Sequence, residues 1–162
     1  HLRSGNNSYK WSTSIINTYL NNSWLNNTSI DSSILVSKSI CDDASGLEKA
    51  SFGGTLKEEN TCQSGIYNNY KVRLLTTNEF ETLISKLDDI SFLTSTANND
   101  YWLMNSSYIP LDKDEFGEVI NSTSKNAMYV KSGTTSVLSG DASIRLAVRP
   151  VITVPKANIL VE

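Results

Sequence analysis

The chain has 162 residues, of which 39% are hydrophobic and 19% are charged, and its 14 basic and 17 acidic groups give a net charge of −3. This length fits one globular domain, and the hydrophobic content is too high for an intrinsically disordered segment. The four arginines form no basic stripe, so nucleic acid is not an expected partner. No apolar run approaches the roughly 20 residues that span a bilayer, and HLRSGNNSYK is not a signal peptide. We expect no membrane insertion by this segment.

Small uncharged polar residues dominate the composition, with 24 Ser, 14 Thr and 17 Asn. Such a composition is common on secreted and cell-surface proteins. Cys41 and Cys62 are too few for a zinc site, which usually takes four ligands, and a disulfide is the leading interpretation. The bond would stabilise the fold by about 3 kcal/mol and persist only in an oxidising compartment. Two buried free thiols in a cytosolic protein are the alternative.

The first predicted element is an amphipathic helix that starts at Trp11. Residues 12–14 offer N-cap hydroxyls, and the Asn21-Asn22 pair suits the helix end. Segment 33–40, rich in Ile and Val, predicts a strand that leads into Cys41, and 42–60 predicts a long loop. The apolar stripe of the helix consists of Trp11, Ile15, Ile16, Tyr19 and Leu20.

A second helix is predicted after a strand over 70–75 (YKVRLL). Thr76 and Glu79 have capping-box spacing, and the stripe of Phe80, Leu83, Ile84 and Leu87 follows. Further strands are predicted over 101–104, 127–131 and 143–154, joined by turns containing Gly117, Gly133 and Gly140, with Pro150 at an edge or bulge. The order of elements predicts an α+β domain in which two short helices pack on a mostly antiparallel sheet.

The sequence offers little catalytic apparatus. Its one histidine is the terminal His1, which nearly excludes Ser-His-Asp and Cys-His mechanisms. Loop carboxylates are the candidates for glycosidase chemistry, but solvated loop acids are the preferred interpretation because nothing nearby would raise a pKa by burial. These candidates are Asp42-Asp43, Asp88-Asp89 and the group Asp112, Asp114, Glu115 and Glu118. We therefore assign no catalytic residue.

Cofactor and metal sites are not predicted either. Segment 112–118 (DKDEFGE) partly imitates a calcium loop but has Phe116 at the fifth position and Thr123 at the twelfth, so it fails as an EF-hand. A weaker calcium site in that loop is the alternative. No phosphate-binding glycine motif is present. Aromatic residues could stack on sugars, although packing in the core is the more ordinary role; they are Trp11, Trp24, Trp102, Tyr67, Tyr70, Tyr101 and Tyr108.

Several phrases in a fixed order carry a family resemblance: LRSGNN, KWSTSIINTYLNNSW, YKVRLLTTNEF, DYWLMNSS, NAMYVKSG and VRPVITV. Together they resemble a class of extracellular domain in low-GC Gram-positive bacteria. Such domains often follow a prepilin-type leader or occur in large wall-associated proteins, and they are related to the C-type-lectin-like and formylglycine-generating-enzyme folds. The resemblance implies a C-type-lectin-like sheet, and it covers essentially the whole chain, 1–162.

The resemblance also implies where the elements lie. Trp11, Ser14 and Leu20-Asn21 mark the first helix, 74–79 the second strand and helix, Trp102-Leu103 a core strand, and 148–151 the closing strand. Domains of this class usually open with strands carrying a W-R-I-type motif, which this sequence lacks. We therefore expect a single surface domain without its first strands, and an open sheet edge near residues 1–10 that invites strand addition.

Three functions follow as hypotheses. The first is a non-enzymatic extracellular domain, either a pilin-like subunit head or an adhesin module, with its contact surface on loops 41–62 and 106–126. Its expected partners are other pilus or surface subunits and a host glycan or protein, and its location is the cell surface or a pilus. The alternatives are a carbohydrate hydrolase that uses loop carboxylates and a structural spacer without a ligand. We prefer the first, in the form of a pilin-like head.

Overall fold

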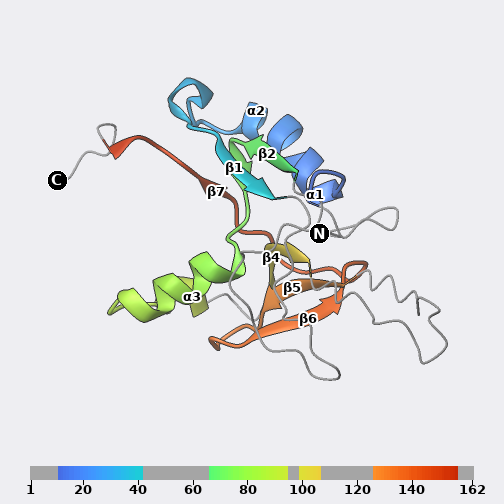
Figure 1. Ribbon diagram of the computed structural model, residues 1–162, viewed down its shortest axis with the longest axis vertical. Coiled ribbons are helices and arrows are strands. Elements are labelled where there is room, and N and C mark those ends of the chain that lie inside the picture. Colours follow the sequence, from blue (N-terminus) through green and yellow to red (C-terminus); the bar gives the residue numbers. More distant parts are fainter. Residues whose placement is uncertain (1–10, 42–65, 95–98, 107–125, 157–162) are drawn as a thin grey trace.

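In the computed structural model of the protein, residues 11–41, 66–94, 99–106 and 126–156 are described. Over these residues the chain combines short helices with antiparallel strand pairs (Figure 1), which confirms the predicted α+β class. The C-type-lectin-like character of the sheet and the single domain over 1–162 stay predictions. Residues 1–10, next to which an open sheet edge was expected, lie outside the described residues.

The N-terminal helix differs from the prediction at both ends. The Ser14 hydroxyl caps it by accepting the Asn17 N–H at 3.1 Å, so Trp11 lies before the helix instead of in its first turn. The helix continues past the Asn21-Asn22 pair through a π-helical middle. Its three consecutive segments are α1 (Ile15–Thr18), η1 (Tyr19–Trp24) and α2 (Leu25–Asn27).

Asn21 explains why the helix does not end where the sequence suggests. Its side-chain Nδ2 donates to Val72 O at 2.8 Å, and its Oδ1 accepts the Val72 N–H at 3.2 Å. Val72 is fully buried, so both of its backbone polar groups need protein partners. The carboxamide therefore takes the place of a neighbouring strand instead of acting as a helix stop.

Two short strand pairs lie beside this helix. Strand β1 pairs antiparallel with β2, with Lys38 opposite Tyr70, and β3 pairs antiparallel with β7. The strand predicted over 33–40 begins only at Lys38, because residues 32–34 form a 3₁₀ turn capped by Asp31. The bounds are β1 (Lys38–Cys41), β2 (Tyr67–Tyr70), β3 (Val72–Arg73) and β7 (Val151–Ile152).

A three-stranded antiparallel sheet has the order β4-β5-β6. Its first two strands were predicted, whereas the third falls where a turn around Gly140 was expected. A Cβ on Gly140 would come within 2.9 Å of the Tyr129 ring, so this glycine makes room for a cross-strand aromatic side chain. The bounds are β4 (Tyr101–Ser106), β5 (Asn126–Val130) and β6 (Val137–Asp141).

The prediction of one long strand over 143–154 is wrong, because β7 is the only regular strand in that range. Ala147 instead forms an isolated parallel bridge with Tyr101, accepting the Trp102 N–H at 3.1 Å and donating to Asp100 O at 2.8 Å. Pro150 has no N–H to continue a ladder, which fits its predicted place at an edge. This segment therefore covers the outer edge of β4 first and pairs with β3 afterwards.

The second helix is confirmed as α3 (Thr77–Lys86). The Thr76 hydroxyl accepts the Glu79 N–H at 3.2 Å, and the Glu79 carboxylate accepts the Thr76 N–H at 3.1 Å, which completes the predicted capping box. Phe80, on the predicted stripe, is fully buried. A single helical turn, α4 (Ser91–Thr94), follows.

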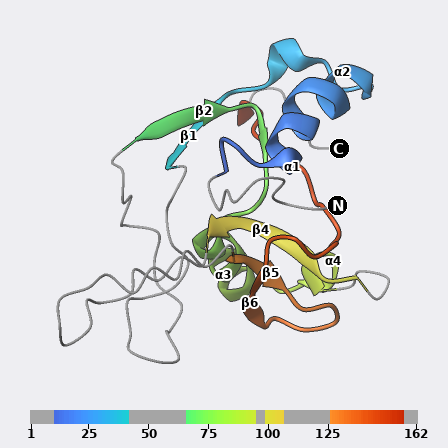
Figure 2. The same ribbon diagram turned by 90° about the vertical axis from the view of Figure 1, so that its right-hand side faces the viewer.

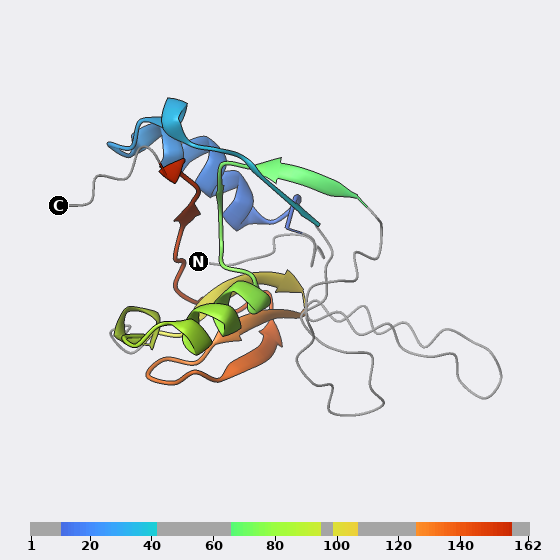
Figure 3. The same ribbon diagram turned by 60° about the vertical axis from the view of Figure 1, so that its left-hand side comes forward.

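Strand β4 separates two hydrophobic clusters, and its six residues are all buried. Trp102 and Met104 face the cluster under the N-terminal helix and β1, whereas Tyr101 and Leu103 face the cluster that contains Phe80 of α3. Figures 2 and 3 show the β4–β6 sheet below the α1–α2 helix and the β1–β2 ribbon. Both faces of the strand are therefore core, so residues 101–104 are apolar in succession instead of alternating, and the polar Asn105 and Ser106 that follow are buried as well.

Asn21→Ala should destabilise the domain by about 2 kcal/mol, because it leaves both buried polar groups of Val72 without hydrogen bonds. Urea unfolding followed by circular dichroism measures the loss. Asn22→Ala is the matched control, since its side chain is exposed on the same helix, and it should change stability by less than about 0.5 kcal/mol. Equal urea midpoints for the two variants would contradict the bridging role of Asn21.

Candidate functional site

The residues predicted to matter from the sequence are only partly described. Cys41 is the buried last residue of β1, and Cys62 lies outside the described residues, so their disulfide stays a prediction. Nearly all of the two loops predicted to form the contact surface, 41–62 and 106–126, also lies outside the described residues. The described residues around Cys41 form the candidate site.

The candidate carboxylates divide in the same way. Asp42-Asp43 and the group Asp112, Asp114, Glu115 and Glu118 lie outside the described residues. Asp88 is exposed, and Asp89 accepts the Ser91 N–H at 2.8 Å at the start of α4. Hydrogen bonds from the Ser91 side chain and backbone hold the pKa of Asp89 below its ordinary value. Asp89 therefore acts as a helix cap.

Other described carboxylates have the same kind of partner. Asp31 accepts the Ser33 N–H, Asp100 the Ser132 N–H and Asp141 the Ser143 N–H, each at 2.8–2.9 Å. Each one satisfies a backbone donor in a turn or at a helix start. These side chains hold the local backbone and are not gathered around a common point: no cluster of three His, Cys, Asp or Glu side chains able to hold a metal occurs among the described residues.

The most concentrated charge interaction joins β1, β3 and α3. Arg73 is 5% exposed, and its Nη1 and Nη2 donate to the two carboxylate oxygens of Glu79 at 2.6 and 2.8 Å. Lys38 forms a second ion pair with Glu79 from β1, and Arg73 Nη1 also donates to Leu74 O at 2.9 Å. The bidentate geometry pairs both terminal nitrogens of a buried guanidinium that would otherwise be very costly, while its buried Nε has no hydrogen-bond partner.

This arrangement sets the protonation of Glu79. Burial alone would raise the pKa of Glu79, but hydrogen bonds from Arg73 and Lys38 and the Arg73 charge outweigh it and lower the pKa to about 2. Glu79 is therefore a carboxylate at any physiological pH. It is an ion-pair and capping residue and is unsuited to act as a general acid.

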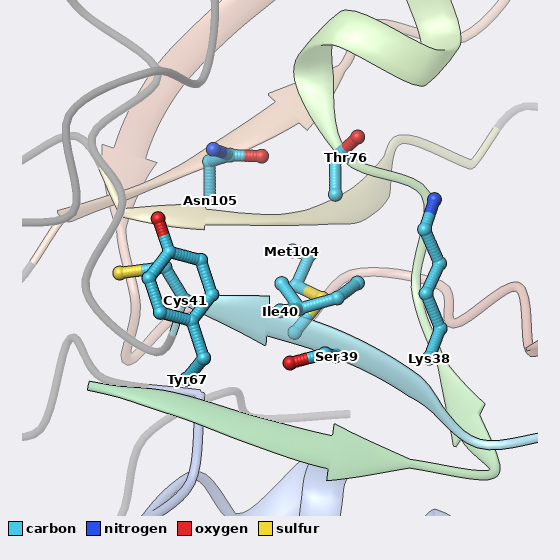
Figure 4. A pocket seen from close by; sticks show the side chains of 8 residues that line it. All are labelled: Lys38, Ser39, Ile40, Cys41, Tyr67, Thr76, Met104 and Asn105. Carbon is cyan, nitrogen blue, oxygen red and sulfur yellow. The ribbon is translucent and has the colours of Figure 1, made fainter. Parts of the chain in front are cut away.

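A small polar cavity of about 110 Å³ opens beside this ion pair, between the β1–β2 ribbon and the start of α3 (Figure 4). Residues 38–41 of β1 form one wall, and Tyr67 closes one end. Asn105 and Thr76 lie on the α3 side, with Ile40 and Met104 between the two walls. The cavity thus has an apolar centre and a polar rim.

The rim groups of this cavity also hold α3. Asn105 Oδ1 accepts the Thr77 N–H at 2.9 Å, and the Thr76 hydroxyl is the α3 cap. Among the described residues that line this cavity there is neither a carboxylate nor an imidazole.

The aromatic residues divide into packing and surface groups. Trp11, Trp102, Tyr70 and Tyr101 are buried, which confirms packing in the core as their role. The Tyr101 hydroxyl also donates to Leu93 O at 2.9 Å, and the Arg149 guanidinium lies over the Tyr101 ring. Burial raises the pKa of Tyr101 to about 12. Trp24 is half-buried, Tyr67 is exposed at the cavity, and Tyr108 lies outside the described residues.

The sequence predicted the capping box but not the Arg73–Glu79 pair or the cavity. The signal in the sequence is only an arginine six positions before the N3 glutamate, a spacing with no meaning in a single helix or strand. The cavity depends on bringing β1 against β4 and the start of α3, which long-range pairing decides, whereas the ion pair depends on how β3 leads into α3.

No family model, curated protein or solved structure matches this chain. Over the described residues, no helix has the length and apolar character needed to cross a membrane.

Glu79→Gln should lower the free energy of unfolding at pH 7 by about 3 kcal/mol, because it removes the counter-charge of the buried Arg73. The folded pKa of Glu79 is depressed from 4.5 to about 2. The stability that it contributes is therefore present above about pH 4.5 and is lost as the pH falls towards 2. The gap between wild type and variant should close over this window in urea titrations.

Glu81→Gln is the matched control for this prediction. Glu81 lies on the same helix and also changes from a carboxylate to an amide, but it makes no ion pair with Arg73 or Lys38. Its unfolding free energy should differ from wild type by less than about 0.5 kcal/mol. A pH-independent gap for Glu79→Gln would show that the loss comes from packing and not from charge.

Proposed function

We propose that this chain is a non-enzymatic domain of the extracellular surface, a pilin-like subunit head or an adhesin module. The observation that carries the proposal is the role of the described carboxylates. Asp31, Glu79, Asp89, Asp100 and Asp141 each accept a backbone N–H that they cap or hold in a turn. Acids with these structural roles are poor candidates for proton transfer to a substrate.

The direction of the pKa shifts supports the same proposal. A glycosidase needs one carboxylic acid with a raised pKa, so that it carries a proton at neutral pH. Hydrogen bonds lower the pKa values of Asp31 and Asp89, and the Arg73–Lys38 pair outweighs burial at Glu79. These shifts favour the permanently ionised form, which is the opposite of what a general acid requires.

The composition and the predicted disulfide support an extracellular location. Hydroxyl and amide groups, not charges, make up most of the polar surface chemistry, and Cys41 lies at the end of a strand where a linkage to Cys62 would tether the following segment. Within this class we favour the pilin-like head, on the resemblance of the sequence. Its partners would be other pilus or surface subunits and a host glycan or protein.

Protease shaving of intact cells that express the native protein tests the location. We expect peptides of this domain in the released fraction, while a cytosolic marker protein stays with the cells. Without reductant, a Cys41–Cys62 cross-linked peptide should appear in the mass map. Recovery of the domain only after lysis, with both cysteines free to alkylating reagent, would overturn the proposal.

The predicted disulfide also has a consequence for stability. The double variant Cys41→Ser/Cys62→Ser should unfold with about 3 kcal/mol less free energy than the oxidised wild type, because the enclosed chain of roughly 20 residues gains freedom when unfolded. Urea unfolding of wild type with and without dithiothreitol provides the comparison. If reductant leaves the wild-type midpoint unchanged, the two cysteines are not cross-linked.

A further inference from the structure

We infer that an open groove on the N-terminal helix, lined by Tyr19, Ser23, Trp24, Asn27 and Thr28, is a binding site for a neutral pyranose sugar. The inference deepens the proposed adhesin or pilus role and rests on it. The helix lies at the end of the molecule opposite α3 (Figures 1 and 3), away from the small cavity beside β1.

The π-helical segment builds this groove. On an α-helix, which turns about 100° per residue, Tyr19 and Trp24 would lie about 140° apart and face different sides. In η1 the backbone bonds run between residues five apart, as from Leu25 N–H to Leu20 O, which reduces the angle between Tyr19 and Trp24 and lets both line the groove. The winding therefore places two aromatic rings at one groove.

The winding is held from the core side. Asn21, in the middle of η1, binds both backbone groups of Val72, so the extra residue in this turn is fixed by strand β3. Single π-helical turns inside α-helices are costly and occur frequently at functional sites. In this helix the π-helical winding shapes the surface, because it lets the rings of Tyr19 and Trp24 line the same groove.

The groove has the chemistry that a pyranose ring recognises. Tyr19 is 40% exposed and Trp24 half-buried, so each offers part of a flat apolar face to the C–H face of a sugar. Ser23, Thr28 and Asn27 supply hydroxyl and amide groups for the sugar hydroxyls. Asn27 Nδ2 donates to Ser23 O at 2.7 Å, which fixes its carboxamide on the helix surface.

The volume of the groove and the charge of its lining residues narrow the class of ligand. The groove measures about 340 Å³, at the lower end of the range for small-molecule sites, and is open to solvent. No charged side chain is among its described lining residues. A neutral sugar unit therefore fits better than an acidic sugar or a charged peptide, either of which would lose hydration without gaining an ion pair.

Tryptophan fluorescence provides a local readout of binding. The chain has three tryptophans, and Trp11 and Trp102 are 0% and 1% exposed, so sugar-dependent changes in emission and in iodide quenching report on Trp24. We expect saturable changes, in the millimolar range or tighter, with at least one of the methyl glycosides of glucose, galactose or mannose, or with N-acetylglucosamine. Sorbitol, which has hydroxyls but no ring face, should give none.

Variants separate stacking from general effects. Tyr19→Ala should weaken binding about tenfold, Tyr19→Phe should stay near wild type because the ring remains, and Asn27→Ala should weaken binding about fivefold. Phe92→Ala is the control, since Phe92 is 57% exposed in α4, outside the groove. Circular dichroism melts confirm that each variant is folded, and calorimetry gives the affinities.

Two outcomes would overturn the inference: no pyranoside alters Trp24 emission, or Tyr19→Ala binds as tightly as wild type. Failure of the groove is distinguishable from failure of the proposed function. If shaving releases the domain from intact cells but no pyranoside binds, the groove assignment alone is wrong. If the domain is recovered only from lysed cells, the surface role is wrong whatever the groove binds.

Discussion

The buried guanidinium of Arg73 is the constraint around which this fold is arranged. A charge removed from water needs a counter-charge in good geometry, and Glu79 supplies one through two parallel hydrogen bonds. Because Glu79 is also the N3 residue of α3 and pairs with Lys38 of β1, one carboxylate fixes the positions of a helix and two strands. The small cavity beside β1 lies where β1, β2 and β4 meet the start of α3.

Short elements are joined in this molecule by side chains as much as by backbone ladders. Asn21 hydrogen-bonds the backbone of Val72 in β3. Next to β4, Asp100 accepts the Ser132 N–H and Ala147 forms a backbone bridge with Tyr101. The Tyr101 hydroxyl donates to Leu93 O. Such partners help to bury strands of two to six residues, because they supply hydrogen bonds that the short ladders lack. The continuous burial of β4 between two clusters follows from this, since both of its edges are occupied and both of its faces are covered.

The charged side chains and the uncharged polar side chains of this protein have different structural roles. Asp31, Asp89, Asp100 and Asp141 accept backbone N–H groups, and Glu79 balances Arg73 while it caps α3. The groove beside η1 instead presents aromatic rings, hydroxyls and an amide to solvent. A surface of this kind is suited to contacts that depend on shape and hydrogen bonding and vary little with salt or pH. This is the basis on which we propose a binding or assembly role.

The sequence alone determined the features that depend on neighbouring residues: the capping box at Thr76, the stripe of α3, the Ser14 cap and the apolar strand at 101–104. Local spacing encodes these because their partners lie within one helical turn or one strand. Only the tertiary structure decided that Asn21 binds β3 instead of ending the helix, that Arg73 meets Glu79, that residues around Gly140 form a strand, and that Tyr19 and Trp24 share a face. Each of these depends on segments up to about 50 positions apart being brought together by core packing, and no periodicity in a single sequence reports such a meeting.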